Sequence, residues 1–569
     1  MPRFKKVGTI DMSSEKNYQE FVKRLDEVCT QYNDKIAIEY MRNDGSKTTY
    51  TFGKIKDHII KAQDFFERVG LRKSDRVAII VPHSPFAIMA GLSLAYSNLT
   101  SVLIDASLPE EEINRLLEFS DVRAVFTTPK IHGLIKSTLI SDIPVFNSDT
   151  FEFSLALFAD SVLGVKKNKT IDPHDDVIAI LFSSGTTTEM KGVMITYTAV
   201  RESRPMYYEI VGATDNYNLL FVLPFNHVAG FFIAFQYFLS GCGLGLIEDV
   251  DAAKISNAFQ TYHPDFFALV PKFYEIVEQK IRQTVKEKGK IITCLFYSTL
   301  ALSRFFRKNF GLKIGKYMFN NIRRQVFGGK LYGLASGGSM LKETTSQFFL
   351  DLGIERWGNF YALTETYVPT VVTGVFDRYP AGTEGRVNRF EDIDVKIHNP
   401  DKNGNGEIRV KTALIMKGYF RDSELTAAAF DEDGYFKTGD LGYIDKKDYL
   451  HVTGRIKEAI MLHTGKKVAP SDVDVLYSSI CNPDIILASC GVPSKNESFD
   501  EIYMFIESGN LSPEEQEEIK KSILDFSAQT STLYQIANVH FIEKIPTTSV
   551  GKVKRFQLRE IALSERAEK

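Results

Sequence analysis

The sequence is poor in cysteine, in excess charge of either sign and in long apolar runs. Its 569 residues include five cysteines, which are scattered and show neither a metal-ligand spacing nor an even disulfide framework. The formal net charge is -3, which gives no general attraction for nucleic acid. We therefore expect reduced thiols, a cytoplasmic protein and no nucleic-acid partner.

No segment is both long and apolar enough to suggest a transmembrane helix. The most apolar stretch, Phe231–Ile247, is interrupted by Gln236 and several glycines, and it falls short of the ~20 residues that a span requires. It predicts a buried helix followed by a strand. The N-terminus is basic but no apolar run follows it, so we do not expect a secretory signal.

The composition is otherwise that of a large globular protein. The chain is 44% hydrophobic and 25% charged, and its length suffices for more than one domain. Apolar, β-branched runs at 75–81, 101–104 and 122–126 alternate with helical patterns at 86–96 and 109–119. This alternation predicts an α/β fold with mostly parallel sheets.

The stretch Val177–Thr196 places a hydroxyl-rich loop between two apolar strands. Serines, threonines, two glycines and Lys191 occupy the loop. Hydroxyl and backbone N–H groups donate to phosphate oxygens and a lysine adds positive charge, so the loop predicts a phosphate clamp. It is not a Walker A motif, because Met190 precedes Lys191. An ordinary Ser/Thr-rich hairpin is the alternative.

Three further segments place polar groups beyond predicted strands. His227 follows a strand at 219–223, where ligands gather in α/β folds, although a structural histidine is the alternative. The glycine pair at 337–338 offers bare backbone to a flat ring or sugar. Tyr361 could stack on a base, and Glu365 could hold Mg²⁺ through its carboxylate.

The last hundred or so residues differ in character from those before them. After 453–458 the pattern is compact α+β, which predicts a small separate domain. Just before it, Asp440 ends a turn-rich segment and could accept both hydroxyls of a ribose, or form an Asx-turn instead. Lys552 lies at the tip of a flexible loop near the C-terminus, where a basic surface loop is the alternative.

Residues 278–330 are strongly basic, with apolar residues interleaved at helical spacing. One interpretation is a basic amphipathic surface that meets anionic lipid, peripheral to a membrane. The other, which the sequence favours, is a solvated helical pair that covers the core.

Taken in order, these segments resemble the adenylate-forming enzymes, which include acyl-CoA synthetases, firefly luciferase and the adenylation domains of peptide synthetases. The resemblance extends from about Tyr50 to Arg559. The matching segments are Ser184–Val193, Leu223–His227, Ser336–Ser339, Tyr361–Glu365, Thr438–Asp440, Gly454–Lys457 and Gly551–Lys552.

The resemblance implies a two-step reaction with ATP, Mg²⁺ and CoA. A carboxylate attacks the α-phosphate of ATP to give acyl-AMP, and a thiol then takes the acyl group. The residues implied to be catalytic are Lys552, Thr186, Glu365 and His227, of which Thr186 and Glu365 would hold Mg²⁺. The residues implied to bind ATP or AMP are Ser184, Gly185, Thr187, Thr188, Lys191, Ser336, Gly337, Gly338, Ser339, Tyr361, Thr364, Asp440 and Arg455.

The resemblance also implies a domain arrangement. A large domain at 1–455 would bind AMP and the acyl substrate, and a small lid domain at 456–569 would carry Lys552. Lys457 falls at the hinge about which the small domain rotates between the two steps.

The substrate is expected to be a medium- or long-chain fatty acid, because the basic insertion and the segment after the hinge look most like long-chain fatty acid–CoA ligases. Phe225, Phe231, Phe232 and Phe235 could line an acyl tunnel or belong to the core. The alternatives are a ligase that loads an acyl carrier protein, an aryl or amino acid activating enzyme, and a catalytically impaired nucleotide- or lipid-binding relative.

Two departures from the family pattern bear on activity. Thr188 and Met190 replace a glycine and a proline of the family's phosphate loop, and Ala362 replaces a glycine of its adenine motif. We expect activity nonetheless, because Thr186, Lys191 and Glu365 are kept.

Overall fold

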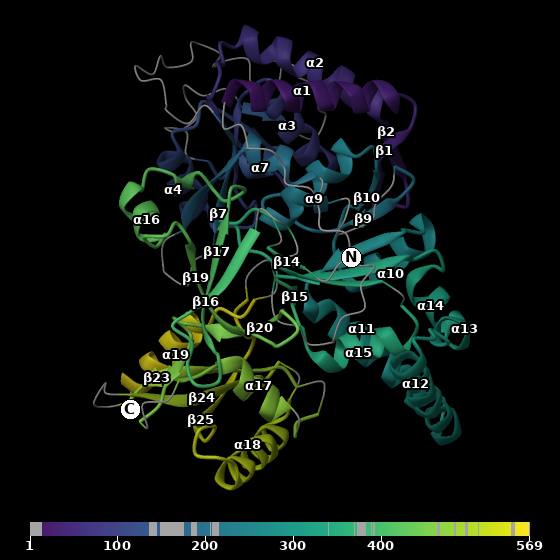
Figure 1. Cartoon of the computed structure of the whole chain (residues 1–569), viewed down its shortest axis with the longest axis vertical. Helices are drawn as coiled ribbons and strands as arrows, with labels where there is room; N and C mark the ends of the chain where they lie inside the picture. The colour runs from purple at the N-terminus through teal and green to yellow at the C-terminus, as the bar shows by residue number, and fades with distance from the viewer. Residues whose placement is uncertain are drawn as a thin grey trace.

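The fold is described from a computed structural model of the chain (Figure 1). The residues that it describes are 14–135, 145–147, 176–183, 190–204, 206–207, 215–338, 341–354, 356–368, 370–372, 383–387, 390, 393–463, 467–478, 480–482, 485–494, 499–509, 511–547 and 552–567. No helix within these ranges is long and apolar enough to cross a membrane.

A sheet of seven strands forms part of the N-terminal half. Its order is β18 (Gly418–Tyr419), β8 (Lys191–Thr196), β7 (Val177–Ser183), β4 (Thr100–Leu103), β3 (Arg76–Ile80), β5 (Ala124–Thr127) and β6 (Val145–Asn147). The strands from β7 to β6 pair in parallel. Helices α3 (Pro85–Tyr96) and α4 (Glu110–Ser120) connect them, as the alternating pattern predicts.

A sheet of thirteen strands runs beside it. Its parallel centre is β13 (Trp357–Tyr361), β12 (Gly333–Gly337), β11 (Phe266–Leu269), β9 (Asn218–Phe221), β10 (Gly243–Ile247) and β1 (Ile36–Met41), and β2 (Lys47–Thr51) closes that edge as an antiparallel hairpin. The opposite end is antiparallel and holds β14 (Val371–Val372), β15 (Gly385–Arg386), β20 (Tyr449–Arg455), β19 (Phe436–Ile444), β17 (Gly406–Thr412) and β16 (Ile393–His398).

Helices pack on and between the two sheets. They are α1 (Ser14–Gln31), α2 (Phe52–Arg68), α5 (Pro129–His132), α7 (Tyr197–Glu202), α9 (Val228–Leu239), α10 (Ala252–Tyr262), α15 (Glu343–Asp351) and α16 (Ser423–Ala428). Between β11 and β12 the chain leaves the sheet as α11 (Pro271–Glu287), α12 (Lys290–Phe310), α13 (Gly315–Met318) and α14 (Asn320–Phe327). In Figure 1, α12 extends from the lower right of the molecule.

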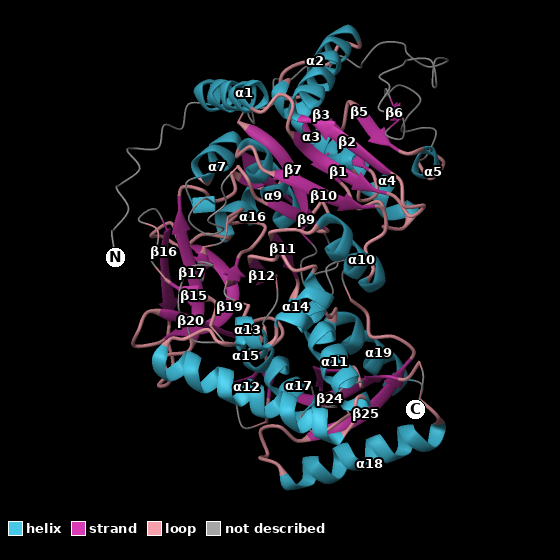
Figure 2. Cartoon of the chain, turned by 90° about the vertical axis from the view of Figure 1, so that its right-hand side faces the viewer, coloured by secondary structure: helices cyan, strands magenta, loops and turns pink. Residues whose placement is uncertain are grey.

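The C-terminal part has sheets of its own. β21 (Ile460–Met461) pairs with β22 (Lys467–Val468), and β23 (Leu487–Pro493), β24 (Asp500–Glu507) and β25 (Ile536–Ile542) form a three-stranded sheet. They pack with α17 (Pro470–Ser478), α18 (Pro513–Gln529) and α19 (Arg555–Ala567), as Figure 2 shows. The chain therefore has the expected α/β architecture with a small α+β domain at its end. The chain passes from the thirteen-stranded sheet to the small sheets between Arg455 and Ile460. The predicted domain boundary between residues 455 and 456 falls within this stretch and stays a prediction.

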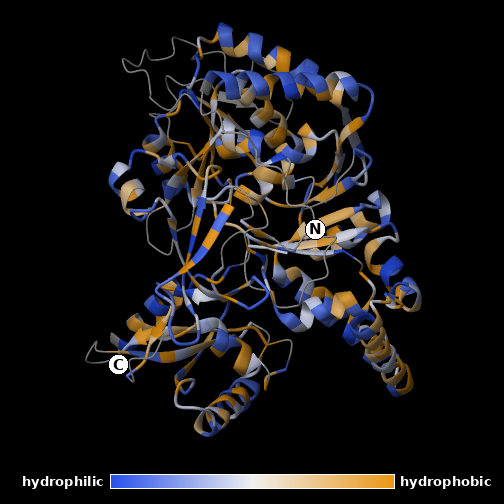
Figure 3. Ribbon diagram, viewed as in Figure 1, coloured by the Kyte–Doolittle hydropathy of each residue, from blue (hydrophilic) through white to orange (hydrophobic). Residues whose placement is uncertain are grey.

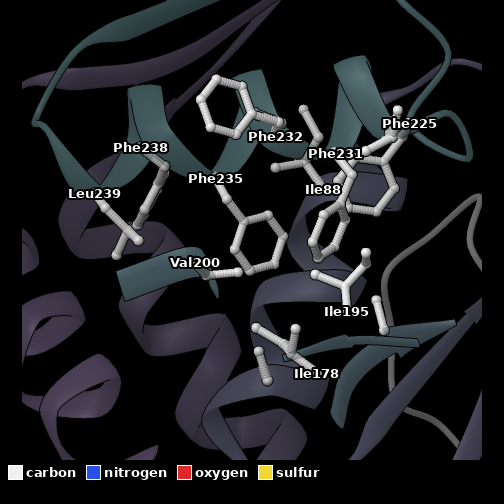
Figure 4. Packing of buried hydrophobic residues seen from close by; sticks show 14 of the residues in the cluster. Ile88, Ile178, Ile195, Val200, Phe225, Phe231, Phe232, Phe235, Phe238 and Leu239 are labelled. Atoms are coloured by element: carbon white, nitrogen blue, oxygen red, sulfur yellow. The ribbon is translucent and has the colours of Figure 1, made fainter. Parts of the chain in front are cut away.

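Helix α9 joins the two halves of the large domain through a cluster of aromatic rings (Figure 4). Phe231 and Phe235 are fully buried, and their ring centroids lie 4.4 Å apart. Phe225 packs on both of them, and Phe232 packs on Tyr367. These rings fill the space around α9, and they belong to the hydrophobic core.

One local prediction was wrong. The segment 434–440 was expected to be turn-rich, but most of it forms β19, in which Gly439 has a φ of +70°. A positive φ within the strand lets it bend there, and its pairing with β20 shifts in register at Leu441 and Gly442. In the small domain, β25 pairs in parallel with β24.

Candidate active site

The two strands expected around the phosphate loop form an antiparallel hairpin, in which Ser183 pairs with Lys191. The predicted loop residues Ser184, Gly185, Thr186, Thr187 and Thr188 lie outside the described residues, as does Ser339. Gly192 packs closely, since a Cβ there would lie 3.1 Å from Ile180 Cγ2 and 3.3 Å from Phe420 Cβ. The hairpin therefore holds Lys191 at the end of the paired strands that adjoins the loop.

Lys191 and Glu365 meet at the ring of Tyr419. Lys191 Nζ lies 5.1 Å from the ring centroid, and the Tyr419 hydroxyl donates to Glu365 Oε1 at 3.0 Å. Burial and the Glu365 carboxylate raise the pKa of the Tyr419 phenol well above its usual value, so it stays a donor. Sequence reasoning missed Tyr419, because the pairing of β18 with β8 brings it beside Lys191.

Asp440 is held by two groups from other strands. The Tyr361 hydroxyl donates to Asp440 Oδ2 at 2.8 Å, and Arg455 Nε lies 2.9 Å from Asp440 Oδ1. Asp440 is 4% exposed, and its backbone N–H donates to the Thr438 hydroxyl at 3.0 Å. The side chain therefore points across the sheet, and no Asx-turn is formed. Burial and the nearby Asp440 charge raise the pKa of the Tyr361 phenol well above its ordinary value.

The end of β12 offers open backbone. A Cβ on Gly337 would lie 3.1 Å from the Phe360 carbonyl oxygen, whereas one on Gly338, at a φ of +85°, would meet nothing nearer than Val270 Cγ1 at 4.0 Å. The Ser336 hydroxyl is buried and has no hydrogen-bond partner among the described residues. A buried hydroxyl without a partner is costly, so this corner suits a ligand that supplies one.

Glu384 is a buried carboxyl group that sequence reasoning missed. Asn359 Nδ2 donates to Glu384 Oε2 at 2.6 Å and to the Thr383 carbonyl oxygen at 3.2 Å. Burial and the negative charge of Asp440 together raise the pKa of Glu384 to about 7, although the hydrogen bond from Asn359 acts in the opposite direction. A single glutamate before a two-residue strand forms no motif from which a buried carboxyl group could be predicted. The pairing of β15 with β14 and β20 brings Glu384 to Asn359.

His227 caps helix α9 and does not follow directly on a strand, because β9 already ends at Phe221. His227 Nδ1 accepts from the Ala229 N–H at 3.3 Å. Burial and the nearby Lys552 ammonium lower the pKa of His227 to about 4, so the ring is neutral at pH 7. With Nδ1 accepting, the proton of the neutral ring lies on Nε2.

Lys552 reaches the same place from the C-terminal part of the chain. Burial and the positive charge of Arg455 lower the pKa of its ammonium to about 8, while Asp440, Glu458 and Glu365 act in the opposite direction. The charges of Arg455 and Asp440 act on Lys552, and the charge of Lys552 acts on His227, so these groups lie near one another. They come from α9, β20, β19 and the segment before α19.

Lys457 lies exposed in the turn that joins β20 to β21. Ile456 N–H donates to the Gly439 carbonyl oxygen at 2.8 Å and Ala459 N–H to that of Arg455 at 2.9 Å. Beyond the turn, Arg555 pairs with Asp474 at 2.6 Å and with Glu458 at 3.6 Å. The turn is thus the covalent crossing between the large sheet and the small ones. Thr364 is half-buried beside Glu365.

Comparison of the sequence with known protein families matches residues 25–420 to the family described as AMP-binding enzyme. The chain is 29% identical over 94% of its length to 4-coumarate--CoA ligase-like 9 of Arabidopsis thaliana, of which it covers 88%. It is 26% identical over 90% of its length to 4-coumarate--CoA ligase 1 of Solanum tuberosum, again covering 88%.

Two solved structures share the fold. O-succinylbenzoate Coenzyme A synthetase of Bacillus subtilis, in complex with ATP and a magnesium ion, superposes with a TM-score of 0.69 at 18% identity, over 94% of this chain and 99% of that one. A Mycobacterium tuberculosis fatty acyl CoA synthetase superposes with a TM-score of 0.63 at 20% identity, over 96% and 98%.

Proposed function

The chain belongs to the AMP-binding, adenylate-forming enzyme family, within which it is an acid–CoA ligase of the AMP-forming type, and we propose that it activates a medium- or long-chain fatty acid. In this proposal ATP and the fatty acid give acyl-AMP and pyrophosphate. The acyl group then passes to CoA and AMP leaves.

The observation that carries the proposal is the position of Lys552. Its ammonium group lies in one electrostatic site with Arg455, Asp440 and Glu365, next to His227. A cation there would neutralise negative charge that builds up between an attacking carboxylate and the α-phosphate. Fixed charges of this kind provide most of the catalysis in phosphoryl and nucleotidyl transfer.

The other site residues divide among the parts of ATP. Lys191 and the hydroxyl loop before it would bind the β- and γ-phosphates. Asp440 and Arg455 would hold the ribose hydroxyls, and Thr364 would contact the α-phosphate. The open backbone at Gly338, the unpaired Ser336 hydroxyl and the Tyr361 ring support an adenine site at the end of β12.

Glu365 is the described residue best suited to Mg²⁺. Its Oε1 accepts from Tyr419, and its carboxylate is the type of ligand that Mg²⁺ prefers. No group of three or more His, Cys, Asp or Glu side chains suited to a metal occurs within the described ranges. This agrees with an ion held by one carboxylate together with nucleotide phosphates, with Thr186 as the further protein ligand in our proposal.

The thiol step requires Lys552 to leave. We propose that the small domain turns about Lys457 after adenylation and opens a path for CoA toward the acyl carbon. His227 lies where that path would meet the acyl group, and its neutral ring with a proton on Nε2 could hydrogen-bond an acyl oxygen.

Fatty acid specificity rests on the apolar surroundings of His227. Phe225 precedes His227 and Phe232 lies in the second turn of α9; both belong to the buried core, and in our proposal the small exposed part of each ring forms the wall that a hydrocarbon chain meets. A hydroxycinnamic acid is the second candidate, because the curated relatives include 4-coumarate–CoA ligases. The close packing of Phe231 on Phe235 also favours a short, flat acyl group, since a long chain would have to displace rings.

ATP–pyrophosphate exchange with a panel of acids tests the proposal. We expect exchange with octanoate or palmitate that exceeds exchange with acetate, 4-coumarate and amino acids. Exchange with 4-coumarate alone would replace the fatty acid by the second candidate, and no exchange while ATP still binds would contradict an active enzyme. A thioester assay with CoA and with a phosphopantetheinylated carrier protein then identifies the acceptor.

A further inference from the structure

Helix α12 carries an apolar stripe on the side turned away from the domain. Its inner side buries Phe296, Leu300 and Ser303. Large apolar side chains stand exposed on the outer side, namely Ile291 (83%), Leu295 (62%), Leu302 (43%) and Phe305 (53%). The spacing of 4, 7 and 3 residues places these four on one face of a helix. Figure 3 shows hydrophobic residues along the projecting part of α12.

The helix is firmly held in this orientation. Asp351 of α15 has a side chain that is 0% exposed, and it pairs with Arg304 Nε at 2.8 Å and with Arg307 Nη2 at 2.9 Å. The Ser303 hydroxyl donates to the Asp351 carbonyl oxygen at 2.7 Å. The outer stripe is therefore a fixed feature of the surface. A solvated helix would show polar residues there, so the helical pair expected from the sequence does not account for it.

The charge around the stripe has one sign. Between Glu287 and Glu343 the sequence contains no acidic residue. Over the same stretch it has eleven cations, which are Lys288, Lys290, Arg304, Arg307, Lys308, Lys313, Lys316, Arg323, Arg324, Lys330 and Lys342. Further exposed apolar side chains lie at the end of the helix and beyond it, at Phe310, Leu312, Tyr317 and Met318. A partner of this surface has to be both negative and apolar.

We propose that α12 and the α12–α13 turn dock onto an anionic lipid bilayer. The helix would lie in the plane of the interface, with the four residues of the stripe at the acyl boundary. Lys290 and Lys308 lie at its two ends and off the stripe, where they would contact lipid phosphates. The contact is peripheral, because no described helix is long and apolar enough to span a membrane.

A bilayer fits these features better than a second copy of the chain. Two copies that met through this stripe would bring both sets of cations together, and like charges across an interface cost several kcal/mol in general. A bilayer offers negative headgroups and an apolar layer in one plane, which matches a row of apolar residues with cations beside it.

Vesicle co-sedimentation of the full chain tests the proposal. We expect binding to phosphatidylcholine vesicles that contain 30 mol% phosphatidylserine, weak binding to phosphatidylcholine alone, and loss of binding at high salt. Each removed lysine should lower the partition coefficient about fivefold, so Lys290→Glu with Lys308→Glu should lower it at least about 30-fold. Ile291→Ser with Phe305→Ser should lower it about tenfold or more.

Matched substitutions elsewhere serve as controls. Val475→Ser on α17 and Lys521→Glu on α18 change an exposed apolar residue and an exposed cation, and binding should not change. All variants should keep the thermal midpoint and the ATP–pyrophosphate exchange rate of the parent. The proposal would be overturned if the α12 variants bound the anionic vesicles as strongly as the parent does. A failure of the parent to bind anionic vesicles, or self-association that the Ile291/Phe305 change abolishes, would overturn it as well.

Discussion

The Asp440 carboxylate shows how single residues assemble the nucleotide site. One of its oxygens accepts a hydrogen bond from the Tyr361 hydroxyl, and the other pairs with the Arg455 guanidinium. Both carboxylate oxygens are therefore already oriented before any ligand arrives. Burial strengthens these contacts, because the surroundings screen charge less than water does. A ribose would therefore meet a carboxylate of fixed position.

Lys552→Ala should separate the two half-reactions. Adenylation needs a cation beside the α-phosphate, so ATP–pyrophosphate exchange should fall at least about 100-fold. Thioester formation from supplied acyl-AMP should remain near the parent rate, since the proposed domain rotation removes Lys552 from the site before that step. Lys544→Ala, an exposed lysine of the same domain, is the control. Equal losses in both half-reactions would contradict the rotation.

The pH dependence of adenylation provides a second test of Lys552. Burial and Arg455 lower its pKa to about 8, so the cation is present below that pH and is lost above it. We expect the exchange rate to decline as the pH rises through about 8. In Lys552→Arg, which keeps its charge, any remaining activity should persist to higher pH. An identical decline in both proteins would assign the titration to another group.

Glu384 should make folding stability depend on pH. Its folded pKa of about 7 lies above the ordinary 4.5, so the folded protein binds a proton that the unfolded chain has lost. Stability should therefore fall as the pH rises from about 4.5 to 7, by up to about 3 kcal/mol. Glu384→Gln should remove this pH dependence. In urea unfolding, the stability of the variant relative to the parent should be higher at pH 8 than at pH 5. Parallel curves for the two proteins would show that Glu384 ionises at its ordinary pKa.

At the scale of elements, the contact between α12 and α15 depends on one buried carboxylate. The Asp351 carboxylate forms ion pairs with Arg304 and Arg307. It also accepts a hydrogen bond at Oδ1 from the Gln347 side-chain amide at 2.8 Å. Gly315 comes close to the same residue, since a Cβ there would lie 2.3 Å from the Asp351 carbonyl oxygen. Both side chain and backbone of Asp351 thus fix the helical excursion to the domain.

Asp351→Asn should loosen this contact. The substitution leaves the two arginines without their counter-charge, and we expect a loss of about 2–3 kcal/mol in the free energy of unfolding. Asp433→Asn provides the control, because its side chain is 77% exposed and pairs with Lys396 at the surface. A change no larger than that of the control, measured by urea titration, would show that apolar packing alone holds α12.

For the whole molecule, the decisive feature is that Lys552 and Arg455 lie on opposite sides of the turn at Lys457 yet share one site. The turn is short and exposed, and backbone hydrogen bonds hold its two ends. Rotation about such a turn can move one whole domain while both cores stay intact.

Lys457→Pro should restrict that rotation. Proline fixes φ, and among the described residues no hydrogen bond uses the Lys457 N–H, so the present arrangement should tolerate the change. We expect adenylation within about threefold of the parent and CoA thioester formation lowered at least about tenfold. Lys457→Ala keeps the backbone free and should affect neither step. Equal rates in the proline variant would place the hinge elsewhere.

The sequence by itself determined the fold class and most of the candidate site residues. The period of its apolar residues depends on burial in strands and helices, and this pattern is readable from neighbouring residues alone. Motifs such as 361–365 are local as well, so Tyr361 and Glu365 could be named without a structure.

Only the tertiary structure decided which distant groups meet. Tyr419 reaches Glu365 through the pairing of β18 with β8, and Glu384 enters the site through two short strands. Likewise, the outward side of α12 could not be known before its buried side was found. These features depend on contacts between residues far apart in the chain, and no local pattern records such contacts.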